Sequence, residues 1–262
     1  MNDTPDTSPT LAMDGAIATI QLNRPRQANR IEHGDLDVLH QHVKQITENA
    51  AIRAVILTGV GKHFSAGYDL TSILSTVEED PTLEFATNPF GLMVDAFESL
   101  PQPVICALNG GVYGGATDLA LACDLRLGVP HTKMFMPAAG LGLHYYLSGM
   151  KRYVSRLGFN TAKRLFLFAE SMDATQMLHT GFLDRIVAAE DLETEAQKTA
   201  QSVASMAPLA IQGMKQALNS LAHGELDPDL FAKTETMCLR SNDIREGVNA
   251  WREKRSADFK GD

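Results

Sequence analysis

The sequence has no long hydrophobic run and no leader-like start. Its 262 residues contain no stretch of about 18 consecutive apolar residues, which excludes an ordinary membrane-spanning helix. The first residues lack a basic segment followed by an apolar block, so we expect no secretory signal. These absences predict a cytoplasmic protein without a membrane partner.

Cysteine is scarce. Cys106, Cys123 and Cys238 are the three in the chain, and they form no CxxC pair. Such an odd, unclustered set is typical of reduced, mostly buried thiols in a cytoplasmic protein. The histidines are scattered too, and His40 and His42 lack the i,i+4 spacing of helical metal ligands. We therefore predict no metal site.

Basic residues are outnumbered by acidic ones. The chain has 23 Lys and Arg against 32 Asp and Glu, a net charge of −9 and a pI of about 5.4. Nucleic-acid-binding proteins usually carry a basic surface, so we expect no nucleic-acid partner. Two phosphate-binding patterns are also missing: GVGKHFS (59–65) lacks the P-loop spacing, and no GxGxxG opens a helix early in the chain.

Strand-like and helix-like segments alternate along the chain, as in an α/β protein. Hydrophobic residues make up 44% of the chain, enough for a full core in one large domain. Short β-type runs alternate with segments of helical periodicity over 34–48 and 114–124, which predicts right-handed crossovers and a parallel sheet. The predicted strands are 16–23, 53–59, 103–110 and 124–129.

From about Leu147 the pattern becomes helical, with a helix beginning at Pro208. We divide the chain into a flexible, polar start (1–10), an α/β core (11–200) and a C-terminal helical region (201–262). Trp251 is expected to pack the last helix.

Two glycine-bearing turns carry the chemical signal. HFSAGYDL (63–70) and NGGVYGGATDL (109–119) each follow a predicted strand. Glycine permits positive φ and a close approach of ligand to backbone, and a helix beginning after such a turn has unpaired N–H groups. Two converging amides would form an oxyanion hole for a thioester or ester oxygen. Spacing alone also fits two ordinary strand-to-helix turns.

Over nearly its whole length the chain resembles the crotonase family, the enoyl-CoA hydratase/isomerase group. Both turns match, and so do LNRPRQAN (22–29), GFLDRIV (181–187) and the terminal REGVNAWREKRSADFKG (245–261). The resemblance implies a crotonase-like ββα superhelix core and a C-terminal helical trimerisation region.

The resemblance also implies a ligand and its contacts. An acyl-CoA thioester would place its carbonyl between the backbone N–H groups of Tyr68 and Gly115. Coenzyme A enters as part of the substrate, and no other cofactor is expected. A homotrimer or a dimer of trimers is expected as the assembly. The remaining predicted contacts to coenzyme A are Arg26, Ala28, the backbone near Ser65 and Ala66, and a C-terminal lysine, Lys254 or Lys260.

The chain departs from the family pattern at both positions where hydratases carry a glutamate. The first position holds Asp118, one methylene shorter, and the second holds Ala138, which has no proton to transfer. Water addition by two glutamates is therefore doubtful. Asp118 keeps a claim as a catalytic group, because dienoyl-CoA isomerases of the family also place an aspartate there. It could equally stabilise the start of its helix.

The stretch FMPAAGLGLHYYLSG (135–149) holds the other acid/base candidates. Tyr146 falls where several members place a catalytic aspartate, and Tyr145 where methylmalonyl-CoA decarboxylase places a tyrosine. His144 is suited to proton transfer in both directions at neutral pH. Each of these three side chains could instead serve only to line an apolar pocket. Weaker candidates are Glu84 and Glu98, whereas Asp124 and Arg152 are interpreted as structural.

The prediction is an acyl-CoA-processing enzyme of this family that stabilises a thioester enolate with altered acid/base residues. Decarboxylation of a malonyl-type thioester is the leading variant, because it needs no glutamate pair. Isomerisation is the second candidate reaction and C–C hydrolysis is the third. The alternative is a non-catalytic acyl-CoA-binding homologue, for which Ala138 is the best support.

Overall fold

The four predicted strands lie in one sheet in a computed structural model that describes residues 8–69, 71 and 88–262. The sheet has six strands in the order β1-β2-β3-β5-β7-β10, and the edge strands β1 and β10 were not predicted. Only β1 pairs antiparallel; the other strands are parallel. The middle strands β3 and β5 are apolar and buried on both faces, as parallel strands require. The strands are β1 (Thr10–Asp14), β2 (Ile17–Leu22), β3 (Ala54–Gly59), β5 (Val104–Leu108), β7 (Leu125–Gly128) and β10 (Arg185–Ile186).

A second, smaller sheet runs beside the first in the order β4-β6-β8-β9. Each of β3, β5 and β7 in the large sheet is followed directly by a strand of the small sheet. This repeat confirms the predicted ββα superhelix. The short strands escape sequence periodicity because each spans three residues: β4 (His63–Ser65), β6 (Gly111–Tyr113), β8 (Lys133–Phe135) and β9 (Ser171–Asp173).

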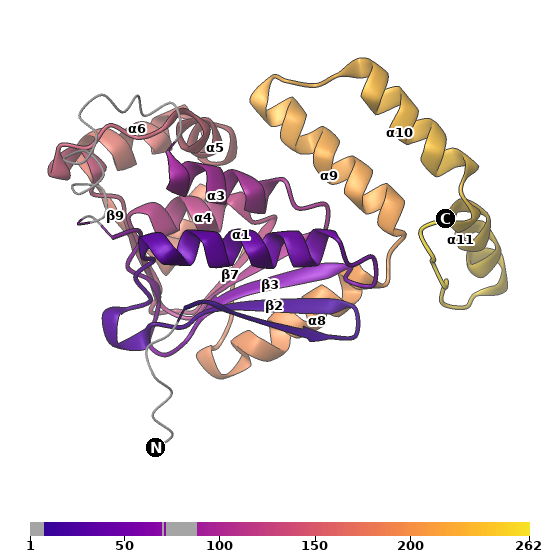
Figure 1. Ribbon diagram of the computed structural model, residues 1–262, viewed down its shortest axis with the longest axis horizontal. Coiled ribbons are helices and arrows are strands. Elements are labelled where there is room, and N and C mark those ends of the chain that lie inside the picture. Colours follow the sequence, from indigo (N-terminus) through magenta and orange to yellow (C-terminus); the bar gives the residue numbers. More distant parts are fainter. Residues whose placement is uncertain (1–7, 70, 72–87) are drawn as a thin grey trace.

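Helices cover both faces of the large sheet (Figure 1). On one face lie α1 (His33–Thr47), α3 (Pro89–Glu98) and α4 (Gly115–Ala122), and the larger apolar core fills the space beneath them. On the other face α8 (Leu192–Ala204) buries Ala196 and Ala200 against β3 and β5. Helix α8 therefore belongs to the packing of the large sheet. Of the predicted flexible start, residues 1–7 lie outside the described part, and β1 begins at residue 10.

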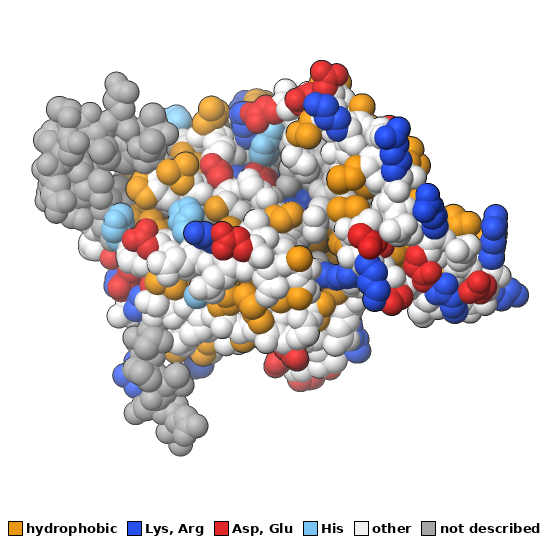
Figure 2. Space-filling view, turned by 45° about the vertical axis from the view of Figure 1, so that its right-hand side comes forward, with side chains coloured by type: hydrophobic (Ala, Val, Ile, Leu, Met, Phe, Trp, Pro, Cys, Tyr) orange, Lys and Arg blue, Asp and Glu red, His pale blue; other side chains and the backbone are white. Residues whose placement is uncertain are grey.

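Six further helices complete the described chain: α5 (Leu147–Leu157), α6 (Phe159–Phe168), α7 (Ala174–Thr180), α9 (Pro208–His223), α10 (Pro228–Arg240) and α11 (Asn242–Glu253). The last two stand away from the sheet (Figure 1). Figure 2 shows acidic, basic and hydrophobic side chains interspersed on one face of the molecule. Trp251 is 80% exposed, so the prediction that it packs the last helix was wrong. No helix in the described residues is long and apolar enough to cross a membrane.

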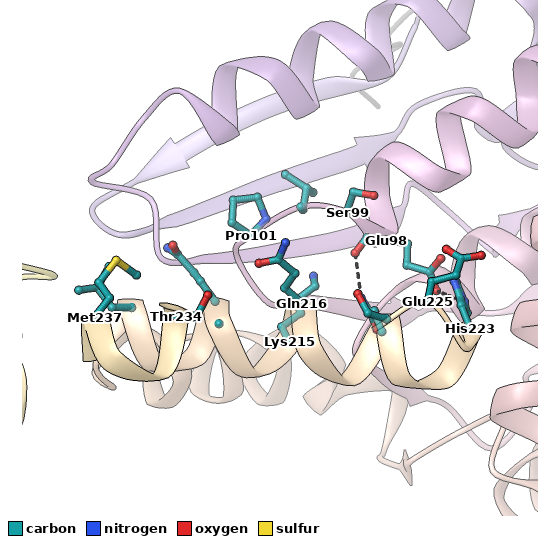
Figure 3. Close-up of a pocket in the computed structure, with 15 residues that line it drawn as sticks. Glu98, Ser99, Pro101, Lys215, Gln216, His223, Glu225, Thr234 and Met237 are labelled. Atoms are coloured by element: carbon teal, nitrogen blue, oxygen red, sulfur yellow. Dashed lines mark hydrogen bonds and ion pairs between the residues drawn. The ribbon is translucent and has the colours of Figure 1, made fainter. Parts of the chain in front are cut away.

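A polar stripe on α9 docks the helical region to the core. Lys215 donates to the Gln102 carbonyl at 3.0 Å and to Asp124 Oδ2 at 2.6 Å. One and two turns further on, Asn219 donates to the Glu98 carbonyl at 3.2 Å and His223 Nε2 lies 3.6 Å from Glu98 Oε1. These contacts border a cavity of about 550 Å³ between α9 and the end of α3 (Figure 3).

The Lys215–Asp124 pair yields a stability prediction. Lys215→Ala leaves Asp124 and the Gln102 carbonyl without their buried donor, and we expect a loss of about 2–3 kcal/mol of unfolding free energy. Urea unfolding followed by circular dichroism measures it. Lys198→Ala, which removes an exposed pair with Glu195, is the matched control and should leave the midpoint nearly unchanged. Equal midpoints for both variants would contradict the docking role of Lys215.

Candidate active site

The two glycine turns meet at the edge of the small sheet. Strands β4 and β6 pair in parallel and bring the turns that follow them side by side. Gly67 has φ +93°, and a methyl group there would lie 2.6 Å from the Tyr113 carbonyl oxygen and 3.0 Å from Gly115 N. Only glycine permits both this φ and this approach. The turn that carries Tyr68 thus packs directly on the amide that begins α4.

The amides of Tyr68 and Gly115 flank this contact. Ile31 N donates to Gly67 O at 2.9 Å and Asp69 N donates to Ile31 O at 2.9 Å. Because N–H groups alternate in direction along an extended strand, the Tyr68 N–H faces away from Ile31. Gly115 is the first residue of α4, where an N–H has no intrahelical acceptor. Two such donors can bind one carbonyl oxygen.

Asn29 connects the segment predicted to hold coenzyme A to this turn. Its side-chain nitrogen donates to Val60 O at 2.9 Å and His63 O at 2.8 Å. Its own carbonyl accepts from the buried Ser65 hydroxyl at 2.7 Å, and Ala66 N donates to Ala28 O at 2.7 Å. The Ser65 hydroxyl is therefore used internally. Sequence reasoning did not single out Asn29, although an Asn after a Pro-initiated turn tolerates its φ of 53°.

Asp118 is fully buried and bound on both oxygens. Arg152 Nε donates to Oδ1 at 2.9 Å and Arg152 Nη2 donates to Oδ2 at 2.9 Å. The Tyr146 hydroxyl also donates to Oδ2. Both Asp118 and Arg152 have a relative exposure of 0%. The carboxylate is thus covered by Tyr146 and neutralised by Arg152.

Arg152 is the centre of a larger ionic cluster. Its Nη1 lies 2.7 Å from Asp95 and 2.9 Å from Glu98, and Glu98 also pairs with Arg156 at 3.1 Å. Burial lowers the pKa of Arg152, but the hydrogen bonds and charge of Asp118 outweigh it and raise that pKa above its ordinary value. These pairs support the structural interpretation of Arg152. The Glu98 carboxylate is paired with two arginines. Glu84, the other weaker candidate, lies outside the described residues.

Aromatic rings connect the buried carboxylate to the glycine turns. Tyr145 stacks on Tyr146 at 4.4 Å between ring centroids, and Phe90 meets Tyr146 edge-on at 6.3 Å. Phe90 in turn stacks on Tyr68 at 5.2 Å, and a methyl group at Gly115 would lie 2.8 Å from its ring. Burial, and then the charge of Asp118, raise the pKa of both Tyr145 and Tyr146 well above 10. Sequence reasoning missed Phe90, which had no motif to mark it.

Two predicted residues lie apart from this cluster. The His144 side chain is exposed and lies 2.8 Å from the carbonyl of Tyr145. Lys260 pairs with Asp258, and its neighbour Phe259 accepts from Arg53, the residue before β3. Arg26 follows the opposite end of the parallel strand β2. A six-residue strand is about 20 Å long, so Lys260 and Arg26 of one chain are far apart.

The spiral of ββα units and the paired glycine turns are those of the crotonase class. Residues 12–262 match the model of the enoyl-CoA hydratase/isomerase family, and the chain belongs to this family. YngF of Bacillus subtilis is 34% identical over 248 residues, 94% of this chain and 95% of that protein. The short-chain-enoyl-CoA hydratase of Clostridium acetobutylicum is 30% identical, with 94% of each chain covered.

A solved structure gives the same result. The enoyl-CoA hydratase of Bacillus anthracis superposes with a TM-score of 0.87 at 30% identity, covering 98% of this chain and 100% of that chain.

The role of Asn29 can be tested by substitution. Asn29→Ala removes buried hydrogen bonds to Arg24, Val60 and His63 and places alanine at φ 53°. We expect a loss of about 2–4 kcal/mol of unfolding free energy, measured by urea unfolding. Weaker binding of coenzyme A should accompany it in calorimetric titrations. Asn160→Ala, at an exposed position of α6, is the control and should change neither quantity. Wild-type stability and coenzyme A affinity in Asn29→Ala would contradict the role of Asn29 in holding these segments together.

Proposed function

We propose that this protein is an enzyme that acts on an acyl-CoA thioester by stabilising its enolate. The observation that carries the proposal is the packing of the Gly67 turn on the amide of Gly115. The proposed donors to the thioester oxygen are the backbone N–H groups of Tyr68 and Gly115 at this contact. Polarisation of that carbonyl stabilises negative charge at the adjacent carbon. The names of the hydratase relatives support a substrate of this class.

We further propose that the protein is not a two-glutamate hydratase. Ala138 is buried in the segment after β8 and has no acidic group. Asp118, the other carboxylate position, is enclosed by Arg152 and Tyr146. Loss of CO₂ from a malonyl-type thioester, double-bond migration and C–C hydrolysis all pass through the same enolate, and none requires a pair of glutamates to hold a water.

The proposed assembly is a homotrimer or a dimer of trimers. Helices α9 to α11 expose large apolar side chains, which is costly for a monomer in water. A second chain would also bring its Lys260 toward the Arg26 segment, which Lys260 of the same chain does not approach. The exposed apolar residues are Met214, Leu218, Leu221, Leu230, Phe231, Met237, Leu239, Ile244, Val248 and Trp251.

The alternative is an acyl-CoA binder that has lost its chemistry. Ala138 and the buried Asp118 favour it, because neither presents a free carboxylate to a ligand. The two proposals differ in turnover. A binder would hold coenzyme A esters and convert none of them, and Asp118→Asn would leave its affinity unchanged.

Substrate tests separate these proposals. We expect turnover of methylmalonyl-CoA or isomerisation of an enoyl-CoA, and only slow hydration of crotonyl-CoA. Absorbance of the enoyl thioester and mass spectrometry of the products measure the three reactions. Rapid crotonyl-CoA hydration would contradict the proposal that the missing glutamate matters. Tight binding with no turnover of any of these esters would support the binder.

The oxyanion role of the glycine turn can be tested directly. Gly67→Ala forces a methyl group against the Tyr113 carbonyl and the Gly115 amide. Because loss of one donor in such a site lowers kcat by about 10²–10³-fold, we expect a loss of this order on any converted substrate. Gly140→Ala, at a position with nothing within 4 Å, is the matched control and should keep full activity. Equal activity of the two variants would refute the assignment.

A further inference from the structure

Asp118 is connected to the acyl site through one hydroxyl group. Its Oδ1 is bound by Arg152 Nε, and its Oδ2 accepts from Arg152 Nη2 and from the Tyr146 hydroxyl. A methyl group at Gly149 would lie 2.9 Å from both Asp118 Oδ2 and the Tyr146 ring, so α5 encloses the pair from the other side. Tyr146 also touches Phe90, the ring that lies at Gly115. A substrate on the two amides therefore meets Tyr146 before Asp118.

The Tyr146 phenol oxygen has acceptor capacity. Its own proton is donated to Asp118, which leaves its oxygen lone pairs for other partners. The Tyr145 hydroxyl donates to that oxygen across 3.4 Å. This distance is longer than the usual O–H···O range of about 2.5–3.0 Å, so a substrate can displace the contact.

The groups around Asp118 set the charge balance of the cluster. Two arginines, Arg152 and Arg156, face three carboxylates, Asp95, Glu98 and Asp118. His223 Nε2 also lies 3.6 Å from Glu98 Oε1, and with a neutral His223 the cluster carries one negative charge in excess. A proton that arrives at Asp118 removes this excess and leaves Arg152 paired with Asp95 and Glu98. Ionisation of Tyr146 instead would add a second excess charge, and burial and Asp118 both raise the pKa of Tyr146 against it.

We propose that Tyr146 is the catalytic residue for proton transfer at the carbon next to the thioester carbonyl, and that Asp118 and Arg152 are its positioning residues. In the forward step the C–H bond breaks and its electron pair becomes the enolate held by the two amides. The proton bonds to Tyr146 Oη while the original phenol proton moves to Asp118. The reverse relay delivers a proton to the same or a conjugated carbon. The step rests on the proposed enolate function and places double-bond migration ahead of decarboxylation.

Hydrogen exchange tests the relay without knowledge of the natural acyl group. Butyryl-CoA is incubated with the protein in D₂O, and deuterium at the α-carbon is measured by mass spectrometry. We expect exchange with the wild type. Tyr146→Phe and Asp118→Asn should each slow it by about 10²–10⁴-fold, the usual contribution of a proton-transfer group. The affinity for butyryl-CoA should stay within about threefold of the wild type in Tyr146→Phe.

A double-mutant cycle distinguishes a relay from a structural role. If Asp118 acts through Tyr146, the double variant should exchange no more slowly than the slower of the two single variants. Tyr145→Phe keeps the stacked ring and should cost less than about tenfold. Lys198→Ala, at an exposed ion pair of α8, is the control and should leave the exchange rate unchanged.

Three results would overturn the relay. Undiminished exchange in Tyr146→Phe would exclude Tyr146 as the catalytic residue. Additive losses of rate in the double variant would show that Asp118 acts only in packing. Absence of exchange in the wild type would also refute it, and methylmalonyl-CoA turnover by the same preparation would then show that the enolate proposal survives separately. Because Tyr146→Phe keeps the buried Arg152–Asp118 pair, it tests the relay even if Asp118→Asn fails to fold.

Discussion

The ion pair between Arg152 and Asp118 is the constraint on which the site depends. It joins α5 to α4, and the second arm of Arg152 reaches Asp95 and Glu98 on α3. A fully buried guanidinium is tolerated only when its donors are satisfied, so these three helices are held in one arrangement. Tyr146 at the start of α5 takes its position from the same pair. The proposed proton transfer at Tyr146 therefore depends on the packing of the core.

The other half of the site is made of backbone. Two turns from the small sheet meet at Gly67 and Gly115, and their amides need no particular side chain. Such a site can polarise a thioester whatever residues surround the acyl group. The side chains around it then decide the reaction, because a shared fold does not fix the chemistry performed on it. We propose that in this chain they are phenol rings and one neutralised carboxylate, in place of two glutamates.

Much of the fold could be predicted from the sequence, because it depends on local patterns. The runs 53–59 and 103–110 are apolar enough to be buried parallel strands, and the glycine turns mark where the chain enters the site. The state of Asp118 could not be predicted in the same way. Its partner Arg152 lies 34 residues away, and only the packing of α5 on α4 shows that both oxygens are occupied. Asn29 and Phe90 were missed for the same reason, and Trp251 was misjudged because burial of an apolar side chain depends on which face its helix presents.

The most direct test of the account is a structure of the protein with a bound acyl-CoA. We expect the thioester oxygen within about 3 Å of the backbone nitrogens of Tyr68 and Gly115. Tyr146 Oη should lie within about 3–3.5 Å of the α-carbon while its proton still reaches Asp118. A thioester bound elsewhere would contradict the central claim. So would an acyl group whose α-carbon is separated from Tyr146 by another side chain.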